Sequence, residues 1–146
     1  MKQTIIAVIC FLCVSSLYIQ AQKINHPSLL YTPQRIQQVK QRMQHEPKLQ
    51  EAWGDIKKTA DKALQKKDFN RLDYLSLAYL MTDNKEYADV IKEILLKAVE
   101  AESWGDVEMM ARIPAWRSQL GMAHKSFLSA VGYDAAYNVM PSSERK

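Results

Sequence analysis

Apolar residues recur every three or four positions along most of the chain, which is the spacing of one face of an α-helix. Thr32 and Pro33 mark the start of the first helix, because threonine caps a helix N-terminus and proline suits its first position. Before them, 23–31 is expected to be extended, since Pro27 disfavours helix at the residue that precedes it. Apolar stripes then cover 36–43, 49–64, 72–79 and 87–98, and a further helix is expected over about 116–140.

The segment 71–98 predicts two helices with a very short connection. A helix over about 71–81 is followed by the turn residues Thr82, Asp83 and Asn84, and a second apolar stripe begins directly afterwards. Helices joined by so few residues pack antiparallel. The chain is therefore expected to be all-α, a single domain built from antiparallel helical hairpins.

The first residues have the order of a secretory signal peptide. Lys2 supplies a positive charge, 5–14 is unbroken apolar sequence, and Ala21 is a small residue at the expected cleavage point. The apolar run is shorter than the roughly 20 residues that a membrane helix needs, so no membrane span is expected after cleavage. The predicted division is a leader over 1–21 and a mature helical domain over 22–146.

The positions of the cysteines and the net charge bear on the cellular compartment and on the class of partner. Both cysteines, Cys10 and Cys13, lie inside the leader, so the mature chain is expected to have no disulfide. Export without disulfides is most typical of a bacterial periplasmic or secreted protein. The formal net charge of +4 is too small to indicate a nucleic-acid partner. It is compatible with an acidic polysaccharide without indicating one.

Three segments carry a family likeness, in the family's order and approximate spacing. They are the opening HPSLLYTP at 26–33, the sequence LSLAYLMTDNKEYA at 75–88, and VGYDAAY at 131–137 followed by PSSER at 141–145. Together they resemble the N-terminal stretch of heparinase II/III-like and alginate-lyase-like polysaccharide lyases. The middle segment alone is also typical of other helical-repeat proteins.

This resemblance implies an incomplete α/α toroid, which in the family continues into more helices and a β-sandwich region. The family cleaves uronate-containing polysaccharides by β-elimination, as carbon–oxygen lyases. The resemblance places the catalytic residues beyond Lys146, where a sixth helix starting at Pro141 is expected to be cut off in its first turn. The chain alone is thus expected to be an inactive N-terminal fragment with no cofactor. The alternatives are a non-catalytic periplasmic helical-repeat binding module and an independent small periplasmic helical protein.

The irregular stretch 101–115 and its borders hold the candidate substrate-binding residues, which are Trp104, Arg112, Trp116 and Arg117. Aromatic faces stack on sugar rings, and guanidinium groups pair with carboxylate or sulfate. Equally, the tryptophans can belong to the core and the arginines to the solvated surface. A lyase toroid should direct Trp104 or Trp116 toward a cleft, whereas a repeat module should bury them between helices.

The remaining polar residues predict structure rather than chemistry. His26, His45 and His124 lack the spacing of a metal site, and no glycine-rich phosphate loop or serine nucleophile motif is present. Asp134 continues the apolar stripe of 120–131. An acid on a core-facing stripe must be paired or hydrogen-bonded, so a structural role is expected for Asp134.

Overall fold

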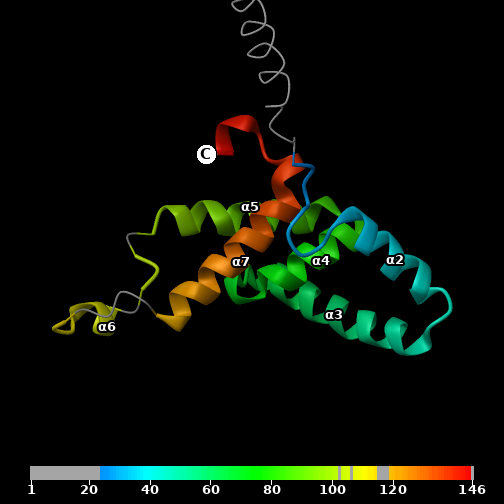
Figure 1. The fold of residues 1–146 in the computed structure, drawn as a ribbon, viewed down its shortest axis with the longest axis horizontal. Helices are drawn as coiled ribbons and strands as arrows, with labels where there is room; N and C mark the ends of the chain where they lie inside the picture. Colours follow the sequence, from blue (N-terminus) through cyan, green and yellow to red (C-terminus); the bar gives the residue numbers. More distant parts are fainter. Residues whose placement is uncertain (1–23, 102, 106, 115–118, 146) are drawn as a thin grey trace, which may run out of the picture.

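The computed structural model describes residues 24–101, 103–105, 107–114 and 119–145, and within them the protein is all-helical (Figure 1). The α-helices are α2 (Pro33–Met43), α3 (Pro47–Lys66), α4 (Leu72–Thr82), α5 (Lys85–Val99), α6 (Val107–Ala111) and α7 (Leu120–Ala136). Short 3-10 turns occur at η1 (Phe69–Arg71), η2 (Tyr137–Val139) and η3 (Ser142–Glu144). The expected all-α class is confirmed. The leader over 1–21 lies outside the described residues.

The start of α2 follows the cap chemistry that the sequence predicts. The hydroxyl of Thr32 accepts a hydrogen bond from the amide of Arg35 at 3.3 Å, and Pro33 occupies the first helical position. Residues 24–31 are non-helical, as expected from Pro27. Pro47 opens α3 in the same manner, although the preceding Glu46 makes no side-chain cap.

Two left-handed residues end the next helices. Lys67, with φ of 51°, stops α3, and Asp83, with φ of 56°, stops α4. Asn84 then accepts a hydrogen bond from the amide of Glu86 at 3.0 Å, so a single residue separates the end of one helix from the cap of the next. The turn expected at 82–84 is therefore the link between α4 and α5, and these two helices pack against each other.

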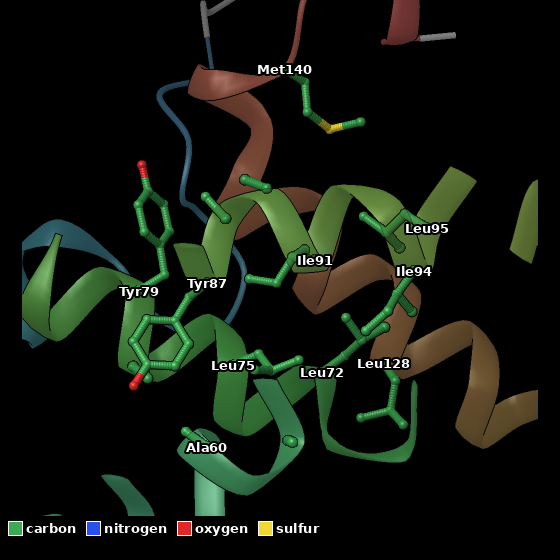
Figure 2. Close-up of a cluster of buried hydrophobic side chains, with 14 residues drawn as sticks. Ala60, Leu72, Leu75, Tyr79, Tyr87, Ile91, Ile94, Leu95, Leu128 and Met140 are labelled. Atoms are coloured by element: carbon green, nitrogen blue, oxygen red, sulfur yellow. The ribbon is translucent and has the colours of Figure 1, made fainter. Parts of the chain in front are cut away.

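The core lies around α4, which contacts α3, α5 and α7, while α5 also contacts α7. Figure 2 shows the cluster of apolar side chains that these helices share. Gly132 lies where α7 comes closest to this cluster. A Cβ atom there would meet Leu72 Cδ2 at 3.3 Å and Ile91 Cγ2 at 3.4 Å. The missing side chain thus permits the close approach of α7 to both α4 and α5.

The helix expected over about 116–140 is present as α7, with 116–118 outside the described residues, but the apolar stripe on its first half is exposed rather than buried. Its described part begins at Leu120 and ends at Ala136, before a 3-10 turn, and Leu120 and Phe127 are 89% and 52% exposed. The burial starts only at Leu128, because the first half of α7 extends beyond α4 and α5 (Figure 1). Periodicity predicts an apolar stripe there, but the exposure of Leu120 and Phe127 shows that this part of the stripe is not covered.

Two smaller elements also differ from expectation. The short α6 lies within the stretch 101–115 that the sequence presents as irregular. At the other end, the residues after Pro141 form one 3-10 turn, Ser142–Glu144, rather than the first turn of an α-helix. Five residues and three residues are too few for a periodic pattern to predict either element.

Candidate functional site

Trp104 lies between the end of α5 and the start of α6, and two hydrogen bonds hold it there. Its indole N–H donates to the carbonyl of Ala98 at 2.8 Å, and its own carbonyl accepts from Lys125 Nζ on α7 at 3.1 Å. The ring is half-buried. Trp104 therefore bridges the last turn of α5 and the first half of α7, and it is fixed in orientation at its polar end.

A hollow of about 270 Å³ lies beside this tryptophan. Its lining is mainly apolar and comes from α5, α7 and the segment after α7: Leu95, Leu96, Ala98, Val99, Trp104, Ser129, Ala130, Tyr133, Met140 and Glu144. Within the part of the chain that the structure describes, the buried Ser129 Oγ and Glu144 Oε2 atoms have no hydrogen-bond partner. Glu144 Oε2 is 4.0 Å from Lys92 Nζ. The hollow thus offers an aromatic face, aliphatic surface and two polar atoms.

The other candidate residues are not all placed. Arg112 is exposed in the segment that follows α6. Trp116 and Arg117 lie outside the described residues. Of the four candidates, Trp104 alone is described at the edge of a hollow, and the expected grouping of two tryptophans with two arginines stays a prediction.

The buried side chain of Asp134 accepts several hydrogen bonds from the N-terminal segment. It is 3% exposed, and its carboxylate accepts hydrogen bonds from the amides of Ser28 and Leu29, both at 2.8 Å. His26 Nδ1 lies 2.5 Å from Asp134 Oδ1. The expectation of a buried, hydrogen-bonded acid is confirmed. One carboxylate ties the chain before α2 to the last turn of α7.

Neighbouring rings and polar groups complete this contact, which we call the Asp134 clasp (His26, Ser28, Leu29 and Asp134). The His26 ring stacks on Tyr137 with 3.9 Å between centroids, and the Asn138 amide donates to the carbonyl of His26 at 2.8 Å. Burial by itself raises the pKa of Asp134. Hydrogen bonds from the Leu29 amide, from His26 and from the Ser28 amide outweigh it, and the pKa lies below its ordinary value.

Sequence reasoning missed a second polar contact, at the edge of the core. The Tyr87 hydroxyl donates a hydrogen bond to Asp61, which also accepts from Lys57 Nζ at 2.7 Å. The pKa of Asp61 is lowered, first by Lys57 and then by Tyr87. The spacing of Lys57 and Asp61, four residues apart on one helix, is a signal for their pairing. No pattern in the sequence joins them to Tyr87, 26 residues further along.

The described residues do not form a metal centre. No group of three or more His, Cys, Asp or Glu side chains within the described ranges is arranged to hold an ion. His26 is engaged by Asp134, whereas His45 and His124 are exposed. No helix in the described part of the chain is long and apolar enough to cross a membrane.

Comparisons with known proteins identify no family for this chain. No protein-family model, no curated protein and no solved structure matches the chain.

Proposed function

We propose that this chain is the N-terminal helical portion of a secreted polysaccharide lyase, which cleaves uronate-containing polysaccharide by β-elimination. The proposal starts from the likeness of 26–33, 75–88 and 131–137 to heparinase II/III-like and alginate-lyase-like enzymes. Three short likenesses are stronger evidence for membership of a family when their residues contact one another in the fold than when they lie far apart.

The observation that carries the proposal is the Asp134 clasp. His26 and Ser28 belong to the first segment and Asp134 to the third, with more than a hundred residues between them along the chain. They nevertheless meet through one buried carboxylate. The first and third segments thus share one structural role, which is to fix the N-terminal lead-in on α7.

The middle segment occupies the centre of the same unit. It spans most of α4, its two-residue link and the start of α5, and it includes the buried Leu75, Tyr79 and Tyr87 (Figure 2). In the proposed arrangement, α4 and α5 form one antiparallel pair of an α/α toroid. The helix α7 then begins the layer that follows, against both of them.

In this proposal the catalytic groups belong to parts of the enzyme beyond Lys146. β-Elimination needs a group that neutralises the uronate carboxylate, a base for the C5 proton and an acid for the leaving oxygen, held in one geometry. Among the described residues, His26 is engaged by Asp134 and Tyr87 by Asp61. The part assigned to this chain is to support that site and, at Trp104, to contribute to its edge.

The reading frame around codons 1–146 tests the proposal. Translated past the codon for Lys146, the source genome should encode further helical pairs and then a β-rich region, with the histidine, asparagine or arginine and the tyrosine that the chemistry needs. A frame that encodes neither would overturn the assignment. The enzyme translated from the whole frame should form unsaturated uronate products, whereas residues 22–146 alone should form none.

The hollow beside Trp104 favours a second candidate, a non-catalytic periplasmic helical-repeat module. Its lining is more aliphatic than a sugar subsite needs, with Leu95, Leu96, Val99 and Met140 around the indole. Affinity electrophoresis through gels containing alginate or heparin separates the two candidates. Retardation that Trp104→Ala removes supports the lyase, and migration unaffected by either polysaccharide supports the module.

A further inference from the structure

A second hollow lies apart from Trp104, between the N-terminal lead-in, α3 and α4. It has a volume of about 140 Å³ and opens to solvent. Tyr31 lines it from the lead-in, Ile56 from α3, and Asp73, Tyr74 and Leu77 from α4. One carboxylate, two phenol rings and two aliphatic side chains therefore face a common space.

The carboxylate in this hollow has no partner within the described chain. Asp73 Oδ1 is buried and receives no hydrogen bond from a described residue. Asp73 also takes part in none of the ion pairs among those residues. A buried carboxylate oxygen without a donor costs free energy, so a cationic or donor group that enters the hollow gains the interaction that the protein itself does not supply.

The Tyr31 phenol stays neutral at physiological pH. Burial, followed by the charges of Asp73 and Tyr74, raises the pKa of Tyr31 to about 12. The ring of Tyr74 already attracts a cation, since the Arg71 guanidinium carbon lies 5.5 Å from its centroid. Neutral tyrosine rings present negative π-faces, which attract ammonium groups.

The geometry points to a binding site for a small organic cation, an alkylated ammonium group whose charge faces Asp73 and whose alkyl groups contact Tyr31 and Tyr74. An anion would meet the carboxylate and be repelled. A purely apolar ligand would leave Asp73 Oδ1 without a donor. A bare divalent metal ion needs several oxygen ligands, and the described residues here supply one carboxylate. This inference is independent of the proposed function.

Choline and its neutral isostere 3,3-dimethylbutan-1-ol test the site as a matched pair of ligands. They share shape and volume, and they differ by one positive charge. Titration of the mature chain by calorimetry or by NMR of the tyrosine resonances should show choline binding about tenfold more tightly, because the alcohol has neither the ionic nor the cation–π attraction. Equal affinities, or no binding of choline, would overturn the assignment.

Variants locate the effect within the hollow. Asp73→Asn keeps the side-chain shape and removes the charge, so it should weaken choline binding about tenfold and leave the alcohol unchanged. Asp89→Asn, on the exposed face of α5, is the matched control and should change neither affinity. Melting temperatures check that both variants fold. Choline affinity that survives Asp73→Asn in a folded protein contradicts the inference.

Discussion

His26 Nδ1 and Asp134 Oδ1 lie 2.5 Å apart, although 108 residues separate them in the chain. The amides of Ser28 and Leu29 donate to the same carboxylate. Around Leu29, which is 59% exposed, the N-terminal lead-in is therefore held to α7 by polar contacts rather than by apolar burial. The contribution of this contact to stability can be measured on the chain itself.

Asp134→Ala should lower the free energy of unfolding by about 1–3 kcal/mol, because it leaves the amides of Ser28 and Leu29 without their acceptor. The measurement is urea unfolding followed by far-ultraviolet circular dichroism. Asp55→Ala, an exposed substitution on α3, is the control and should change stability by less than about 0.5 kcal/mol. An unchanged transition midpoint for Asp134→Ala would show that the clasp contributes nothing.

The free energy of unfolding should decrease more steeply on acidification in the wild type than in a variant that lacks the Asp134 carboxylate. The pKa of Asp134 is lower folded than unfolded, so its contribution is present above the unfolded value of about 4 and is lost as pH falls through the folded value. Unfolding midpoints of the wild type and Asp134→Asn, compared between pH 7 and pH 2, should therefore converge at the acid end. A constant gap across this range contradicts the assignment.

Gly132→Leu should destabilise the protein by about 1–3 kcal/mol, because the new side chain enters the contact of α7 with Leu72 and Ile91. Gly54→Leu is the matched control, also within a helix, and a Cβ atom there meets nothing within 4 Å. That control should be neutral or gain up to about 1 kcal/mol from helix propensity. The melting temperature should thus fall for Gly132→Leu and stay or rise for Gly54→Leu, and a Gly132→Leu variant that melts no lower than the control would contradict the packing.

The leader is expected to be removed after Ala21 on export. The positive Lys2, the apolar run and the small residue at the cleavage point motivate this prediction. N-terminal sequencing of protein recovered from its host's periplasm or medium should begin at Gln22. Mature protein that retains Met1 would contradict it.

The sequence was informative where local chemistry decides the structure. The cap at Thr32, the turn before Lys85 and the all-α class all follow from short-range rules, and they are confirmed. Asp134 was recognisable as structural because an acid interrupted an apolar stripe. Its partners were not, since backbone amides donate the hydrogen bonds and any residue can supply an amide.

The failures share one physical cause. Periodicity says that a face is apolar but not whether anything covers it, so Phe127 was expected inside and is exposed. The hollow that includes Asp73 forms where the N-terminal lead-in, α3 and α4 come together. The spacing of residues within one helix does not predict that arrangement. Trp104 was proposed as a candidate because it is a tryptophan within an irregular segment, whereas its hydrogen bond to Ala98 requires the fold.

The most direct test of the central claim is an ultraviolet assay for unsaturated uronate product with heparin, heparan sulfate and alginate as substrates. The enzyme translated from the whole reading frame should release this product from at least one of them. Residues 22–146 alone should release none, because the base, the acid and the carboxylate-neutralising group are assigned to later parts of the chain. Absence of product from the whole enzyme on all three substrates, or turnover by 22–146 that persists after repurification, would contradict the account.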